Sequence, residues 1–540
     1  MKINIVSKNC RDAENEIDDF VKNNDLYTIP FDSSCIYLLA SYEEDAIRIH
    51  LSNPTLAQYD SLANRVTSSL EFSLKWLWET SMESKGNNQP DLLFERSESM
   101  YEKAVFLKNI AFRYPALVMA LRHAKEENVK LICNNYLIKT ETPYFSDSRY
   151  EAYSYFRSHK VFSKNYDDSL LNLITNHLSS SEANFSYPLD QLLPEVYKGL
   201  ISRIRNQFHL PKNWKIRSYT LENYITVVNV LYSLAFIHFH GRSYAIQKGY
   251  RDTDLRNRLL ILDRSWLLDQ IIVSTGLDFK TVENVIKDLT FRAPSFKNFD
   301  PCLQPVINIG GSDIVLMPSL LIFSSLERNF ITLMNREDKS KTIYSTIVEQ
   351  KEGVLRDQII EDIKNPNLRY SQIKFPDKQR LPDVDLAIID DINQVVLFCE
   401  LKWFIGPATA DEVIHRGEDL QKGICQLLAI RKALNDGGRT AFTELGISPT
   451  YRRYFALLSK TWIGHDRNQE PTIPIILSDH FVQKLNHLPS LESTCTWLNQ
   501  RLFLPIEGTD YHVVNCAQEF GNWKLEWPAI EIYPGASLDC

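Results

Sequence analysis

Two apolar stretches separated by a short polar turn constrain the fold of this chain more than any other feature. They lie in the segment LPDVDLAIIDDINQVVLFCELKW, residues 381–403, where VDLAII precedes the turn and VVLFCELK follows it. Stretches so rich in Val, Ile, Leu and Phe predict strands that are buried on both faces. The strand ends nevertheless carry four charged residues: Asp383, Asp385, Glu400 and Lys402. Because buried charges are costly unless they are paired or bind a metal, these strand ends are candidate functional positions.

The segments around this strand pair extend the pattern to helix, strand, strand, helix, strand. A helical stripe of apolar residues runs through 347–365, and a second predicted helix spans 411–434. Further strands are predicted at 454–460 and at 472–478. Alternation of this kind favours an α/β layer in which helices cover a central sheet.

The charged residues are expected to meet across the strand pair. Side chains alternate between the faces of a strand, so Glu400 and Lys402 are expected on one face. If the turn centres on Ile392 and Asn393, Asp385 lies opposite Glu400 on the neighbouring strand. Opposed carboxylates repel each other, and a divalent ion with oxygen ligands, Mg²⁺ or Mn²⁺, removes that repulsion. Lys402 then orients or helps to deprotonate a water molecule and stabilises charge on a phosphate under attack, which predicts phosphodiester hydrolysis.

Residues 345–460 resemble the PD-(D/E)xK, or restriction-endonuclease-like, nuclease superfamily. In that pattern an acid begins one strand of a helix, strand, strand, helix, strand core, and Glu-x-Lys lies on the next strand. The resemblance implies that Asp385 and Glu400 are metal ligands and that Lys402 is the catalytic lysine. Asp383 completes the literal Pro-Asp pair and is the alternate first ligand.

Two flanking helices are expected to contribute further groups, again by resemblance. Glu352 starts the apolar stripe of the first helix and is the expected acid there, with Glu349 one turn earlier as the alternative. Gln426 is a polar residue within an apolar face of the second helix and is expected to assist catalysis. Lys422, one turn before it, is expected to contact the substrate backbone.

The Glu-x-Lys motif alone is a weak signal, because ESK and EQK also occur at 83–85 and 349–351. Only the ELK motif follows an apolar strand that comes one hairpin after an Asp, with both expected helices around it. The structural alternative is that the two acids simply start a strand, while Glu400 and Lys402 form a surface ion pair.

The whole chain of 540 residues is too long for one hydrophobic core and predicts about three domains. We expect a multidomain protein whose N-terminal and middle regions are mostly α-helical, followed by an α/β restriction-endonuclease-like domain with a mixed central sheet flanked by helices. The four predicted regions are a mainly helical domain at 1–185, a helical domain at 186–340, the nuclease domain at 341–480, and an extension packed on it at 481–540. Within the second region, 263–291 resembles a helix-turn-helix or winged-helix unit, and 304–317 reads as a hairpin. Simple helix packing is the alternative for 263–291.

Other features restrict the setting. The nine cysteines are scattered, odd in number and free of any CxxC, so we expect neither a zinc site nor a disulfide framework, and a reducing cytoplasm. No secretion signal or membrane span is expected, because the N-terminus turns acidic early and the most apolar run is interrupted by Asn229. A net charge of −8 excludes a generally basic surface but not a local basic groove.

Two further groups of residues have a functional and a structural reading. His238 and His240 could bind a metal, but their segment is otherwise apolar, which favours packing. The aromatic run YEAYSYF at 150–156 could stack bases, although core packing is the more common role of such a run. The sequence contains no GxxxxGK phosphate loop, so no ATP-driven motor is expected.

The sequence as a whole predicts a Mg²⁺- or Mn²⁺-dependent nuclease that acts on nucleic acid, with DNA as the expected substrate. The resemblance to the superfamily implies 5′-phosphate and 3′-hydroxyl products. The 340 residues before the nuclease domain are expected to select the substrate, self-associate or bind a partner protein. Bacterial antiviral defence or restriction is the expected context. The alternatives are a catalytically silent nuclease-fold scaffold or nucleic-acid-binding subunit, an RNA nuclease and a DNA-repair nuclease.

Overall fold

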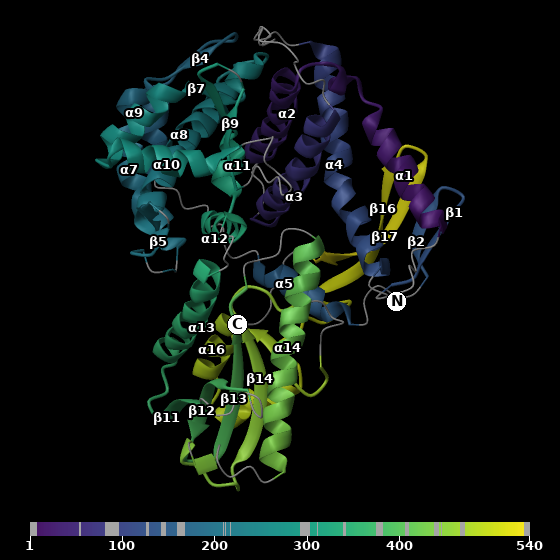
Figure 1. The fold of residues 1–540 in the computed structure, drawn as a ribbon, viewed down its shortest axis with the longest axis vertical. Helices are drawn as coiled ribbons and strands as arrows, with labels where there is room; N and C mark the ends of the chain where they lie inside the picture. The colour runs from purple at the N-terminus through teal and green to yellow at the C-terminus, as the bar shows by residue number, and fades with distance from the viewer. Residues whose placement is uncertain are drawn as a thin grey trace.

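The chain combines a helical body with a smaller body built on a sheet (Figure 1). This computed structural model describes the following residues: 8–52, 56–80, 97–125, 129–141, 147–158, 168–208, 210, 212–216, 218–291, 303–309, 311–337, 342–373, 382–404, 410–436, 442–443, 445–464 and 470–533. The predicted combination of mainly helical early regions and a later mixed sheet is confirmed at this level.

One hydrophobic core runs through the helical body and includes residues from Cys10 to Met334. Its helices are α1 (Lys8–Lys22), α2 (Phe31–Leu51), α3 (Leu56–Thr80), α4 (Glu98–Lys125), α6 (Asp168–Asn176), α7 (Leu189–Asn206), α8 (Leu221–Gln247), α9 (Arg264–Thr275), α10 (Phe279–Leu289), α11 (Pro318–Phe323) and α12 (Leu326–Glu337). The separate domains predicted at 1–185 and 186–340 therefore share a core. The reason is α8, which is apolar on all sides and packs against α2, α7, α10 and α11.

The predicted helix pair and hairpin of the middle region are both present. α9 ends at Gly276, whose φ of 69° is left-handed, and α10 begins after Asp278, whose side chain accepts a hydrogen bond from the Thr281 amide at 3.0 Å. The strands of the adjoining sheet are β7 (Leu260–Asp263), β10 (Asp313–Leu316), β9 (Val306–Asn308) and β8 (Thr290–Phe291), in that order. A helix pair followed by an antiparallel hairpin is the element order of a winged helix, and DNA contact by this unit stays a prediction.

The second body is built on a five-stranded mixed sheet. Its strands are, in spatial order, β11 (Leu368–Ile373), β12 (Val384–Asp390), β13 (Val395–Lys402), β14 (Arg452–Ser459) and β15 (Ile475–Leu477). The first three strands are antiparallel, and β13, β14 and β15 are parallel. The helices packed around it are α13 (Thr342–Asp362), α14 (Ala410–Asn435), α16 (Ser478–His487) and α17 (Leu491–Asn499). The expected helix, strand, strand, helix, strand order is present from α13 to β14 with one strand more, because β11, which was not predicted, lies between α13 and β12 and pairs with β12.

Two segments pack on a different body from the one that the predicted domain boundaries assign to them. Helix α5 (Ser148–Ser158), which belongs to the domain predicted at 1–185, buries Tyr150 and Tyr153 in the core of the sheet body. The core reading of this aromatic run is therefore correct for both tyrosines. The hydroxyl of Tyr153 lies 3.0 Å from Nδ1 of His480 on α16.

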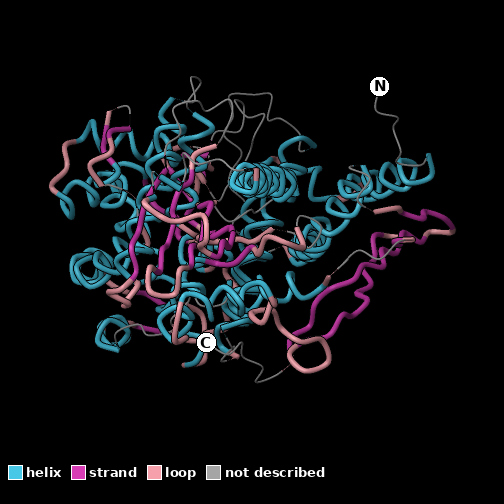
Figure 2. Tube along the Cα trace, turned by 90° about the horizontal axis from the view of Figure 1, so that it is seen from below, coloured by secondary structure: helices cyan, strands magenta, loops and turns pink. Residues whose placement is uncertain are grey.

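The predicted extension at 481–540 also divides between the bodies. Its first part, from α16 to Leu504, packs on the sheet body. Its last part forms a hairpin of β16 (Tyr511–Phe520) and β17 (Trp523–Ile532), and β17 pairs with β2 (Leu137–Thr140) of the helical body. The prediction that the whole extension packs on the nuclease domain is therefore wrong, because pairing with β2 satisfies the backbone of β17 there. Figure 2 shows this hairpin at the side of the helices, apart from the strands that lie among them.

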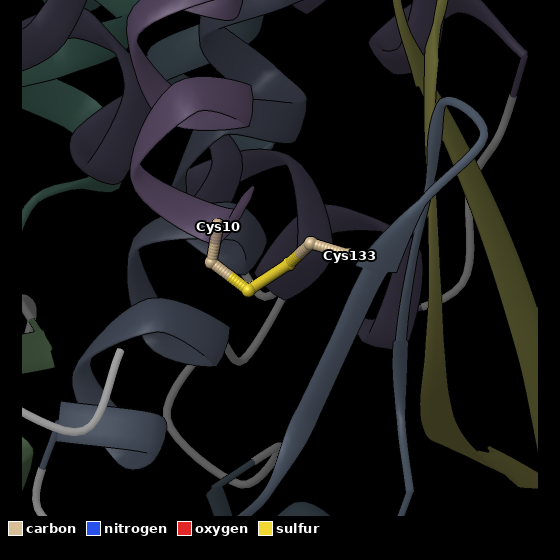
Figure 3. Close-up of a disulfide and its surroundings, with 2 residues drawn as sticks. All are labelled: Cys10 and Cys133. Atoms are coloured by element: carbon tan, nitrogen blue, oxygen red, sulfur yellow. A yellow bond between two sulfur atoms is a disulfide. The ribbon is translucent and has the colours of Figure 1, made fainter. Parts of the chain in front are cut away.

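A disulfide joins Cys10 on α1 to Cys133 on β1 (Leu131–Asn134), as Figure 3 shows. The expectation of unpaired cysteines is corrected here, because α1 packs on β1 and brings together residues 123 positions apart. The free cysteines among the described residues are Cys35, Cys399, Cys425, Cys495 and Cys516. The expected reducing cytoplasm stays a prediction.

Two described helices, α4 and α8, are long and apolar enough to cross a membrane by length and composition. The apolar window of α8 is 94% buried inside the protein, and that of α4 is 39% buried. Core helices of soluble proteins pass the same test, so this is weak evidence for a span.

Candidate active site

The strand pair β12–β13 brings the first two predicted acids together. Leu386 pairs with Cys399, which is the register that the position of the turn predicted, and Asp385 and Glu400 are the next residues on the two strands. Oδ2 of Asp385 accepts a hydrogen bond from the Leu401 amide at 2.9 Å. The carboxyl groups of Asp385 and Glu400 are also close enough for a side-chain hydrogen bond to each other.

Lys402 links acids from two elements. Its Nζ atom lies 2.8 Å from Oε1 of Glu400 and 3.4 Å from Oε1 of Glu352 on α13. Burial alone would lower the pKa of Lys402, but attraction to Glu400 and Glu352 outweighs it, so the pKa is raised. The lysine therefore stays positively charged, and α13 delivers Glu352 to the site as the sequence predicted.

The carboxyl groups hold protons more tightly than usual. Burial, followed by repulsion from Asp385, raises the pKa of Glu400 to about 8, although Lys402 opposes the shift. Burial also raises the pKa of Asp385, which the Leu401 amide partly offsets. Two buried carboxyl groups that repel each other are a place where a cation can replace protons.

A cleft of about 290 Å³ lies against these groups. Four predicted site residues line it together: Glu352, Lys402, Lys422 and Gln426. Lys422 and Gln426 come from α14, and the Nζ atom of Lys422 lies 2.9 Å from Oδ1 of Asp419. The Lys422 side chain is 71% exposed, so it lies at the mouth of the cleft.

The remaining cleft residues were not found from the sequence: Ile331, Lys351, Trp403, Phe404, Arg416 and Asp419. Lys351 lies over the Trp403 ring, 4.9 Å from its centroid, and Arg416 lies over the Phe404 ring at 5.8 Å. Burial lowers the pKa of Lys351 to about 8. The signal available in the sequence was the aromatic pair that directly follows ELK, since aromatic faces attract cations.

Gly423 is a further residue that sequence reasoning missed. A Cβ atom at this position of α14 would lie 2.9 Å from Cδ1 of Leu457, 3.2 Å from Cγ of Glu400 and 3.3 Å from Cε of Lys402. The absence of a side chain therefore allows α14 to approach the face of β13 that carries the site. A glycine inside a helical pattern was the available signal.

The two alternate acids have different outcomes. Asp383 lies just before β12, and its charge contributes to the raised pKa of Asp385. It is therefore a neighbour of the site, while Asp385 makes the contact with β13. The side chain of Glu349 lies outside the described residues.

The site offers two carboxyl groups as ligands for an ion such as Mg²⁺. Among the side chains that the structure describes, no group of three or more His, Cys, Asp or Glu is arranged to hold a metal. Asp385 and Glu400 supply two adjacent carboxyl groups. Because Mg²⁺ usually takes one or two carboxylates and completes its shell with water and substrate phosphate, this pair is sufficient for such an ion.

The histidine pair has a structural role. His238 lies 2.6 Å from the Tyr187 hydroxyl through Nδ1 and 3.1 Å from the Asn257 carbonyl oxygen through Nε2. Burial lowers the pKa of both His238 and His240 to about 3. With both nitrogens of His238 engaged, the packing reading is the correct one.

Comparisons with models of known protein families, with curated proteins and with solved structures found no match for this chain.

Proposed function

We propose that this chain is a metal-dependent phosphodiester hydrolase, a nuclease of the restriction-endonuclease type with DNA as its substrate. The observation that carries the proposal is the meeting of Asp385, Glu400 and Lys402 beside the cleft. The order of α13, the strands β11, β12 and β13, the helix α14 and the parallel strand β14 supports it, because it contains the order of the superfamily pattern with β11 added.

Asp385 and Glu400 would hold a Mg²⁺ or Mn²⁺ ion. When bound, such an ion supplies Lewis acidity and lowers the pKa of a coordinated water molecule. The two carboxyl groups must give up their protons to serve as ligands, which is why their raised pKa values matter.

Lys402 is the group that acts on the reacting atoms. Its permanent charge stabilises the negative charge that develops on the scissile phosphate, and its Nζ protons orient the attacking water molecule. Glu352 holds the lysine from the side of α13, at 3.4 Å. Gln426 and Lys422 face the same cleft, so they are placed to bind the neighbouring phosphates.

The helical body has room for recognition functions. It contains the α9–α10 pair and its hairpin, which would bind nucleic acid or a partner protein, and self-association is a further role for it. A cytoplasmic protein of bacterial antiviral defence or restriction is the context we propose.

One observation favours a second candidate, a catalytically silent scaffold. Lys402 already bridges Glu400 and Glu352, and such a closed ion pair network is stable without a metal. In this case the sheet body would present a binding surface and the helical body would bind nucleic acid.

Cleavage of unmodified nucleic acid tests the proposal. Supercoiled plasmid and circular single-stranded DNA are incubated with the full chain in Mg²⁺ and in Mn²⁺, with EDTA as the control. The proposal predicts nicked or linear products with 5′-phosphate ends that EDTA and Lys402→Ala both abolish. Cleavage that survives Lys402→Ala would refute the assigned site, and a chain inert on both circles that also shows no metal-induced rise in melting temperature would favour the scaffold.

A further inference from the structure

The cleft lies between the two bodies, not on the sheet body alone. Ile331 belongs to α12 and to the core of the helical body, yet it lines the same cleft as Lys402 and Glu352. α12 packs directly on α13, and Lys351 of α13 is attracted to Glu327 of α12. One wall of the candidate active site is therefore supplied by the helical body.

Exposure increases in one direction across the site. The side chain of Glu400 is 3% exposed, that of Lys402 16%, and that of Glu352 30%. On α14 the exposed fraction rises to 35% at Asp419 and 71% at Lys422. The cleft therefore opens toward the α14 rim, and Lys402 and Glu352 line its less exposed side.

The size of the cleft limits what can reach Lys402. A volume of about 290 Å³ is at the lower end of small-molecule sites, which are about 300–1,000 Å³, and suits one nucleotide. A duplex is wider than a single strand, so we expect it to meet α12 at Ile331 before one of its phosphates reaches Lys402.

The charges along the cleft match a phosphate backbone. Lys351, Arg416 and Lys422 add three cations to Lys402, against the acids Glu352 and Asp419. Trp403 and Phe404 are 8% and 5% exposed and lie under cations. Their rings therefore hold Lys351 and Arg416 in position and are not free to stack on bases, so recognition runs through phosphates, without sequence preference.

We propose that the cleft takes one unpaired strand of nucleic acid, entering past Lys422, and that Ile331 on α12 excludes a duplex. The inference rests on the proposed nuclease function and names its substrate class. It makes single-stranded DNA, or an unpaired end of a duplex, the preferred substrate.

Binding and cleavage are measured separately on the full chain. A fluorescent 20-nucleotide DNA strand, the same strand in a blunt duplex, and a single-stranded RNA of equal length are titrated by anisotropy in Ca²⁺. We expect the unpaired DNA to bind at least tenfold more tightly than the duplex, and Arg416→Met to weaken binding of the unpaired strand. The inference would be overturned if the duplex bound as tightly as the unpaired DNA strand or more tightly, or if neither DNA bound. If the RNA bound more tightly than the unpaired DNA strand, the preferred strand would be RNA.

Two variants of α12 test whether Ile331 forms the wall of the cleft that excludes a duplex. Ile331→Ala removes a side chain that lines the cleft, and Leu333→Ala is the matched control, because Leu333 is a buried residue of the same helix outside the lining. We expect only Ile331→Ala to reduce the preference for the unpaired strand, by threefold or more. An unchanged preference in Ile331→Ala, or an equal change in the folded control, would contradict the proposed wall.

Failure of this inference differs from failure of the proposed function. If the wild type cleaves duplex and unpaired strands equally in Mn²⁺ while Lys402→Ala is inactive, the nuclease stands and the strand selection is wrong. If neither is cleaved but the unpaired strand still binds preferentially, with loss in Arg416→Met, the strand selection stands and the proposed hydrolysis is wrong.

Discussion

The Nζ atom of Lys402 lies 2.8 Å from Oε1 of Glu400, two residues earlier on the same face of β13. Glu400 is buried, Lys402 is 16% exposed, and the second acid, Asp385, lies against Glu400. An ion pair of Lys402 with Glu400 alone would not need the carboxyl group of Asp385. The site therefore has one carboxyl group more than Lys402 and Glu400 need to neutralise each other, and this excess is the basis of the predictions below.

Stability should depend on pH through Glu400. Its pKa of about 8 in the folded chain lies above the ordinary value of 4.5, so the folded state binds the proton more tightly than the unfolded state. The contribution of protonated Glu400 is complete below about pH 4.5 and is lost as pH rises through about 8. We expect Glu400→Gln to flatten the fall in melting temperature between pH 5 and pH 8 in metal-free buffer. Glu418→Gln, an exposed site on α14, should keep the wild-type slope.

Divalent ions should stabilise the chain through the two carboxyl groups. An ion that binds only the folded state at a hundred times its Kd raises the free energy of unfolding by about 2.7 kcal/mol. We expect Mn²⁺ or Ca²⁺ to raise the melting temperature of the wild type at pH 8 but not that of Asp385→Asn, which keeps an oxygen to accept the Leu401 hydrogen bond. An equal rise in Asp385→Asn, measured by differential scanning fluorimetry, would exclude Asp385 as a ligand.

Gly423 should be needed for the geometry of the site. In Gly423→Ala the new Cβ atom would press on Glu400 and Lys402 at 3.2 and 3.3 Å, and small displacements of catalytic groups are costly. We expect cleavage to fall about tenfold or more. Gly353→Ala on α13 is the control, because nothing lies within 4 Å of its added Cβ. That change should keep activity and stabilise the helix by about 0.5–1 kcal/mol.

The Cys10–Cys133 disulfide should stabilise the helical body under oxidising conditions. Removing a native disulfide typically costs about 2–5 kcal/mol, and the loop closed here spans 123 residues. Cys10→Ala combined with Cys133→Ala should lower the free energy of unfolding by about that amount without reductant, and much less with dithiothreitol. Peptide mapping without reduction should recover the linked pair, and two free thiols in the oxidised protein would refute the bond.

Local pattern was sufficient to predict that Glu400 and Lys402 lie together. The alternation of side chains on β13 places Glu400 and Lys402 together, and the polar turn sets the register that brings Asp385 opposite. The stripe of α13 then placed Glu352 at 3.4 Å from Lys402. The positions of Asp385, Glu400 and Lys402 depend on neighbours in one hairpin, where strand periodicity is decisive, whereas an acid from the first helix was expected from the resemblance.

Contacts between distant segments could not be read in this way. Ile331 reaches the cleft only because α12 packs on α13, and Tyr153 reaches His480 across more than three hundred residues. The pairing of β17 with β2 and the Cys10–Cys133 bond are equally remote in sequence. Such contacts depend on how whole surfaces fit, and no short pattern in the sequence records that fit.

The most direct measurement of the central claim is the single-turnover rate at which Lys402→Ala cleaves circular single-stranded DNA in Mn²⁺, beside the wild type. Lys432→Ala, an exposed lysine in the last turn of α14, controls for loss of charge. The account predicts a loss of about 100-fold or more in Lys402→Ala and no change in Lys432→Ala. A folded Lys402→Ala that cleaves as fast as the wild type would contradict it.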